Sequence, residues 1–119
     1  MTNEKQEIAS KIDAVIPNLK WEEDVFPTAH KTALLKSDLV IAYFIGVYLS
    51  VMIIGEKVSF SVCVVSPDLE CYEKRKSWTT TKKQAAHQAE RFFDLYKGWI
   101  SDLKATLESH GEKITVTEE

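Results

Sequence analysis

The segment from Leu39 to Val65 reads LVIAYFIGVYLSVMIIGEKVSFSVCVV and decides the fold. Every odd-numbered residue from Leu39 to Ile53 is apolar, and after Gly55-Glu56-Lys57 the apolar positions continue at even numbers, from Val58 to Val64. A period of two indicates β-strands that bury one face. Glycine at the first position of Gly55-Glu56 favours a two-residue type II′ hairpin turn. We therefore expect paired strands with one large apolar face and one face of small, weakly polar side chains.

The part of this segment before the turn is long enough for one strand or for two. Gly46 would bend a single strand at a bulge, whereas a turn at Ile45-Gly46 would divide it. We expect the bent strand, because Ile-Gly is a poor pair for a tight turn. The sixteen uncharged residues from Leu39 to Ile54 fall short of the roughly 20 that span a bilayer as a helix.

A second segment, residues 79–110, has the pattern of an amphipathic helix. Thr79-Thr80-Thr81 offers N-cap candidates, and Gly111 suits the position after the helix end. Its apolar residues recur at steps of three and four, namely Ala85, Ala89, Phe92, Phe93, Tyr96, Trp99, Ile100, Leu103 and Leu107. We expect this helix to cover the apolar face of the sheet. The residues expected in the core include Phe93, Tyr96, Leu103, Val51 and Phe60.

The remaining segments complete an α+β fold. Residues 3–16 predict a first helix that Pro17 ends, because proline disfavours the helical conformation of the residue before it. Residues 30–78 form the sheet region, with a short strand from His30 and a charged edge strand from Glu70 to Trp78. Residues 18–28 are expected to be an ordered loop and residues 112–119 a frayed tail. The predicted fold is an N-terminal helix, an antiparallel meander of three to five strands and a long C-terminal helix across one face.

Composition suits one soluble domain. The chain has 119 residues, 45% of them apolar, and a net charge of −3. A single domain over residues 1–119 can bury a core at this length. Residues 1–10 lack the apolar segment of a signal peptide, so we expect a cytoplasmic protein with no membrane contact. Cys63 and Cys71 are expected to be free thiols in a reducing compartment, the alternative being one disulfide in a secreted chain.

The sequence contains no recognisable reactive constellation. The three histidines, His30, His87 and His110, lie on different predicted elements, with no second ligand at metal-binding spacing. The four glycines are isolated, so there is no glycine-rich phosphate loop. We expect a protein that is not an enzyme and that uses no metal and no cofactor.

Residues 72–83 form the strongest local signal. They carry a net charge of +4, which leaves −7 for the rest of the chain. Cations at the start of a helix, interleaved with aromatic rings, are typical of phosphate contacts. The alternative is an edge strand kept soluble by charge. The candidate phosphate or partner contacts are Lys74, Arg75, Lys76, Trp78, Lys82 and Lys83.

Residues 58–112 resemble a HicB-like antitoxin domain. The matching pieces are Pro67-Asp68-Leu69, then Cys71, then Thr81 followed by Ala85 and Ala89, and finally Gly111-Glu112. The chain departs from that pattern where Trp78 and threonines replace a Gly-Asp before the helix. The resemblance implies a protein-binding antitoxin fold without catalytic residues.

The predicted α-β-β-β-α order is similar to that of the double-stranded-RNA-binding domain. Lys82-Lys83 followed by Ala85 and Ala89 looks like the phosphate-binding motif that opens the helix of that family. Ala86 stands where a further lysine would be expected. This resemblance implies contact with RNA through the helix start.

These observations favour a small non-enzymatic binding protein that acts on a macromolecular partner. We expect an antitoxin-like or inhibitor-like protein of the kind that phages and mobile elements carry, with a protein partner. The alternative is a nucleic-acid-binding accessory protein that uses the basic stretch from Lys74 to Lys83. Because one long helix covers one face of the sheet, we also expect a homodimer that buries the other face.

Overall fold

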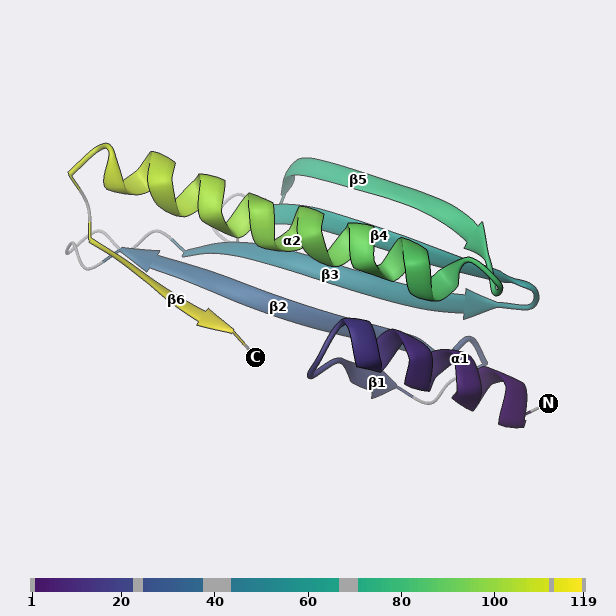
Figure 1. Cartoon of the computed structure of the whole chain (residues 1–119). Coiled ribbons are helices and arrows are strands. Elements are labelled where there is room, and N and C mark those ends of the chain that lie inside the picture. The colour runs from purple at the N-terminus through teal and green to yellow at the C-terminus, as the bar shows by residue number, and fades with distance from the viewer. Residues whose placement is uncertain (1, 23–24, 38–43, 67–70, 112, 119) are drawn as a thin grey trace.

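The computed structural model of the chain describes residues 2–22, 25–37, 44–66, 71–111 and 113–118. Figure 1 shows long antiparallel strands with both helices on one side of them. The α+β class predicted from the sequence is confirmed. The elements in chain order are α1 (Thr2–Val15), β1 (Lys20–Glu22), β2 (Thr28–Ser37), β3 (Phe44–Ile54), β4 (Lys57–Ser66), β5 (Cys71–Thr81), α2 (Ala85–Glu108) and β6 (Ile114–Glu118).

Strands that are neighbours in sequence pair antiparallel, in the order β1-β2-β3-β4-β5. β6 returns to the edge of the sheet opposite β5 and pairs with β2 next to β1. The hairpin turn between β3 and β4 is as predicted, since Ile54 pairs with Lys57 and Gly55 has a φ of 55°. The predicted meander is therefore present, with two further strands, β1 and β6, that the sequence did not indicate.

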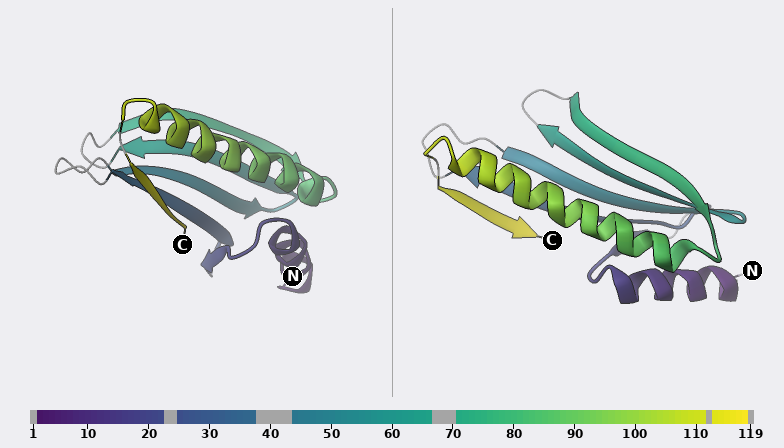
Figure 2. Two further views of the ribbon diagram at one scale, coloured as in Figure 1. Left: turned by 60° about the vertical axis from the view of Figure 1, so that its left-hand side comes forward. Right: turned by 45° about the horizontal axis from the view of Figure 1, so that its top comes forward.

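Alternation along the strands builds the core. The odd-numbered side chains of β3 from Val47 to Ile53 and the even-numbered ones of β4 from Val58 to Val64 are buried. α1 and α2 both lie on this face, as the two views of Figure 2 show. The α2 residues buried against it are Ala85, Ala89, Phe92, Tyr96 and Trp99. Full burial of a side chain such as Phe92 contributes roughly 1.5–3 kcal/mol.

Two of the predicted core residues lie at the margin of the core. Val51, Phe60 and Tyr96 are buried as expected, but Phe93 and Leu103 are half-buried. Phe92 takes the central place, with its ring centre 4.7 Å from that of Phe60.

The long helix begins later than predicted. Thr79 to Thr81 belong to β5 and pair with β4 as far as Lys57, so these β-branched residues extend a ladder and do not cap a helix. Residues 82–84 form a turn, and Gln84 occupies the N-cap position without a side-chain cap bond. The predicted helix over residues 79–110 is thus Ala85–Glu108.

The predicted frayed tail is also wrong. Ile114 to Glu118 pair with Ser37 to Ala33 of β2, and the Ile114 side chain is buried. The predicted loop between residues 18 and 28 likewise contains β1, which pairs with the start of β2. β1 and β6 therefore share one edge of β2.

Gly46 does not bend β3 at a bulge. The β2–β3 and β3–β4 pairings pass through Gly46 in unbroken register, and the irregularity lies between β4 and β5 at Val64/Val65. A Cβ atom at Gly46 would lie 2.5 Å from Cε2 of Tyr48, so the glycine makes room for that ring. Residues 39–43 of the predicted strand and the Pro67-Asp68-Leu69 motif lie outside the described residues.

Candidate functional site

The face of the sheet opposite the helices is the main candidate surface. No element lies over it in the part of the chain that the structure describes (Figure 2). We call it the open face. Its side chains come from alternate positions of β2 to β5, and they include Thr28, His30, Thr32, Tyr48, Ser50, Met52, Ser59, Ser61, Cys63, Arg75, Ser77 and Thr79.

Strand register places small hydroxyl side chains at the middle of the open face. Ser50 lies opposite Ser61, which lies opposite Ser77. The Oγ atom of Ser59 lies 3.0 Å from Oγ1 of Thr79, a hydrogen bond across β4 and β5. Small side chains leave the strand backbone close to the surface, so another layer could approach it closely.

Two adjoining hollows lie on the open face. One has a volume of about 260 Å³. Most of its lining side chains carry hydroxyl groups, such as Thr28, Ser61 and Thr79, and Arg75 also lines it. The other, of about 420 Å³, is lined by His30, Tyr48 and Cys63 among others. Ser50 lines both. The two hollows therefore adjoin at Ser50, one toward β4 and β5 and the other toward β2 and β3.

Ionisable groups on the open face are few. Cys63 is a free thiol, so the disulfide alternative is wrong. Burial raises the pKa of the Cys63 thiol, and the nearby Arg75 guanidinium opposes that shift. The raised pKa favours the protonated thiol, which disfavours nucleophilic chemistry at Cys63.

His30 is the other titratable side chain of note on the open face. Its Nδ1 atom lies 3.9 Å from Glu22 Oε1, and the two form an ion pair when the imidazole is protonated.

The candidate contacts of the basic stretch do not lie together. Successive side chains of β5 point to opposite faces, so Lys74 and Lys76 lie on the helix side and Arg75 on the open face. The Lys82 side chain is only 11% exposed, with Nζ 3.9 Å from Glu56 Oε1. Lys83 is exposed in the turn before α2, not in its first helical turn. The predicted contacts are therefore divided between the two faces of β5 and the turn before α2.

The aromatic rings beside these lysines are already in contact. The Trp78 ring centre lies 3.7 Å from that of Phe92, and Trp78 Nε1 donates to Gln88 Oε1 at 3.2 Å. Lys74 Nζ lies 4.5 Å from the ring centre of Trp99, and Lys76 Nζ 5.5 Å from that of Trp78. These rings anchor β5 to α2 and are not open platforms for stacking a base.

Other chemistry-bearing groups are dispersed. Within the described residues no group of three or more His, Cys, Asp or Glu side chains could hold a metal ion. None of the described helices is long and apolar enough to cross a membrane. The Tyr96 hydroxyl is fully buried and has no hydrogen-bond partner among the described residues. Its pKa is raised by burial and, to a lesser extent, by the charge of Glu118.

The period-two pattern predicted the small residues of the open face, whereas the division of the charges between the two faces was not predicted. Alternation along the predicted edge strand was a usable signal that Lys74 and Arg75 would point to opposite faces. The ion pair of Lys82 had no local signal, because its partner Glu56 lies far back in the sequence, at the β3–β4 turn.

Comparisons with protein-family models, with curated proteins and with solved structures found no match for this chain. The resemblances to HicB-like antitoxins and to double-stranded-RNA-binding domains therefore remain predictions from sequence.

Proposed function

We propose that this protein is a non-enzymatic binding protein that acts on a protein partner in the cytoplasm, in the manner of an antitoxin or inhibitor. The partner would contact the open face. The observation that carries the proposal is that α1 and α2 cover the same face of the sheet and leave the other to solvent among the described residues. The helices already bury the apolar face of this antiparallel sheet, so the solvated face is available for a partner that would add a further layer.

The composition of the open face supports a macromolecular ligand. Met52 and Ile54, at the hairpin end of β3, are 36% and 41% exposed. Next to them lies the shallow depression of small hydroxyl side chains around Ser50 and Ser61. An apolar rim beside a flat area of low side-chain bulk suits a protein surface better than a small molecule, which needs a deeper pocket.

A second copy of the chain is one candidate occupant of the open face. A twofold dimer would place the open faces of two sheets against each other, as in a β-sandwich. In that case the homodimer would be the working form of the binding protein.

A nucleic-acid partner is the alternative, and the geometry favours it less. The six candidate contacts are divided between the helix side of β5, the open face and the turn before α2. A phosphate backbone tracks a continuous basic path, and its binding weakens with salt by a log–log slope of about −0.9 per phosphate on duplex DNA.

The proposal is tested with variants at two matched serines. Ser61 lies at the centre of the open face, and Ser101 is exposed on α2. Ser61→Arg adds a bulky cation to the proposed contact surface, whereas Ser101→Arg adds the same charge elsewhere. We expect quantitative affinity capture from the native host to recover a protein with wild-type and Ser101→Arg baits and to lose it with Ser61→Arg.

Sedimentation of the same three proteins separates a second copy from a foreign partner. If the open face forms a dimer, Ser61→Arg alone becomes monomeric. Equal recovery of the same partner by all three baits, with unchanged sedimentation, would contradict the proposal. Recovery of nucleic acid with the steep salt dependence above would favour the alternative.

A further inference from the structure

The two outer edges of the sheet differ in how they are protected. The outer edge of β2 is shared by β1 and β6, which have only 3 and 5 residues. Short strands are a common way to prevent unwanted pairing at an edge. β5 has 11 residues, and among the described strands only β4 pairs with it. Figure 1 shows β5 along one rim of the molecule, and Figure 2 shows it flaring away from α2.

The hydrogen-bonding pattern identifies which amides of β5 face outward. The backbone N–H of Lys82 donates to the Glu56 carbonyl at 3.3 Å, which makes these two residues a hydrogen-bonded pair that continues the β4–β5 ladder. Such pairs alternate with non-bonded pairs in an antiparallel ladder. Trp78 and Lys76 therefore bond to β4, and the backbone groups of Ser77 and Thr79 point to the outer edge.

Most of the usual devices that block an edge are absent along this stretch. β5 is long, it contains no proline, and its pairing with β4 is in unbroken register from Lys74 to Thr81. Charged side chains are the one protective feature that this edge retains against strand pairing. Charge discriminates between incoming strands, because cations repel a basic strand and attract an acidic one.

Two cations lie beside this edge on one side of the sheet. Lys74 Nζ and Lys76 Nζ lie over the rings of Trp99 and Trp78, so both ammonium groups lie on the side of the sheet that carries α2. A strand added to β5 would place alternate side chains on that same side, opposite Lys74 and Lys76. Aspartate or glutamate at those positions would pair with them.

We propose that the outer edge of β5, from Lys74 to Thr81, binds an extended acidic segment of a partner protein by adding it to the sheet as a further strand. Strand addition takes its affinity from main-chain hydrogen bonds and its specificity from alternate side chains. This inference rests on the proposed function as a protein-binding protein, but it uses a surface separate from the open face.

The test uses a short synthetic peptide of alternating aspartate and valine and follows amide hydrogen exchange by NMR. At about nine-tenths saturation, the Ser77 and Thr79 amides should exchange roughly tenfold more slowly, because exchange then proceeds from the free fraction. The Lys76 and Trp78 amides, which already bond to β4, should not change. The same peptide with N-methylated valines and a lysine–valine peptide are the controls, and neither should protect these amides.

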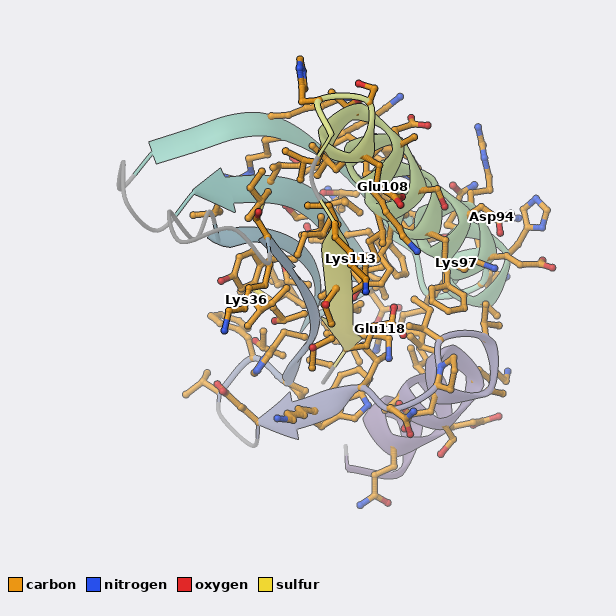
Figure 3. All side chains as sticks on the ribbon, turned by 90° about the vertical axis from the view of Figure 1, so that its left-hand side faces the viewer. Lys36, Asp94, Lys97, Glu108, Lys113 and Glu118 are labelled. Carbon is orange, nitrogen blue, oxygen red and sulfur yellow. The ribbon has the colours of Figure 1, made fainter. Side chains whose placement is uncertain are left out.

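Two pairs of variants separate the contribution of backbone hydrogen bonds to peptide binding from that of side-chain charge. Ser77→Pro removes an outward N–H without removing a β4–β5 bond, and Ser77→Val keeps that N–H. Loss of the peptide's central hydrogen bonds should weaken its binding about tenfold in Ser77→Pro alone. Lys74→Glu with Lys76→Glu should abolish binding of the acidic peptide and create binding of the lysine–valine peptide. The matched control, Lys97→Glu with Lys104→Glu, lies on exposed positions of α2 away from β5 and should bind as wild type (Figure 3 labels Lys97).

If Ser77→Pro does not fold, the test is still decided by two results: the amide exchange of the wild type with peptide, and peptide binding by the Lys74→Glu, Lys76→Glu double variant and its control. The inference would be overturned by any of three results: no binding at millimolar peptide, equal protection of all β5 amides, or equal peptide binding by the two double variants. Protection of the same amides by a single-stranded oligonucleotide in place of the peptide would also overturn it. None of these results affects the open face, which the Ser61 and Ser101 variants test independently.

Discussion

The two faces of the sheet are built from alternate residues of the same strands, yet they differ in almost every property. On the helix side, residues such as Leu49 and Phe60 are fully buried beneath α2. On the open face, their chain neighbours Ser50 and Ser61 line a shallow depression. One face therefore supplies the stability of the domain. The other contributes little to stability and is the surface that we propose for partner binding, so substitutions on the two faces should separate stability from partner binding.

The largest expected effect is on the buried face. Phe60→Ala should lower the free energy of unfolding by about 3–5 kcal/mol, because it opens a cavity against Phe92. Ser61→Ala, one residue along on the open face, should stay within about 0.5 kcal/mol of wild type. Urea denaturation of both variants measures the difference. Similar losses in the two variants would show that both faces contribute equally to the stability of the domain.

The next effect concerns the strand that closes the outer edge of β2. Deleting residues 112–119 removes β6 and the buried Ile114 side chain, so we expect a loss of about 2–3 kcal/mol. Thermal and urea unfolding of the truncated chain measure it. A truncated chain as stable as the full one would show that β6 does not contribute to the core.

A smaller effect, of opposite sign, is expected at Tyr96. Its buried hydroxyl lacks a partner among the described residues, so Tyr96→Phe should stabilise the protein by about 1 kcal/mol. The raised pKa of Tyr96 means that the unfolded chain releases this proton at about pH 10 while the folded chain keeps it. The stability of the wild type should therefore fall as pH rises above about 10, and Tyr96→Phe should lose part of that fall. Paired urea titrations from pH 8 to 11 measure the difference, and parallel curves would contradict this.

The smallest effect lies on the open face itself. Ser59→Ala removes the hydrogen bond to Thr79 and should cost about 0.5 kcal/mol, a typical value for a cross-strand hydroxyl pair. Differential scanning calorimetry detects a change of this size as a small fall in Tm. A loss of several kcal/mol would mean that the hydroxyl groups of the open face contribute substantially to stability, contrary to our expectation.

Local patterns in the sequence predicted the features that depend on periodicity. The alternation from Val47 to Val64 and the stripe from Ala85 to Leu107 indicated the sheet, its apolar face and the covering helix. Gly55 likewise indicated the hairpin. These signals are strong because burial of one face imposes a fixed period on many residues at once.

The features that depend on distant pairing were not predictable in this way. Thr79 to Thr81 suit both a helix cap and a strand, and their pairing with β4 decides between the two. Ile114 to Glu118 are too few to be distinguished from a tail, and their partner β2 lies far back in the chain. The basic stretch appeared to be one patch because its residues are consecutive, but the strand distributes them over two faces.

The central claim is that the open face is the surface that meets the partner. The most direct measurement is photo-cross-linking in the native host, with a photoreactive amino acid placed at Ser61 or, as the control, at Ser101. We expect a discrete cross-linked protein, either a foreign partner or a second copy of this chain, from Ser61 and none from Ser101. Adducts from Ser101 with none from Ser61 would contradict it.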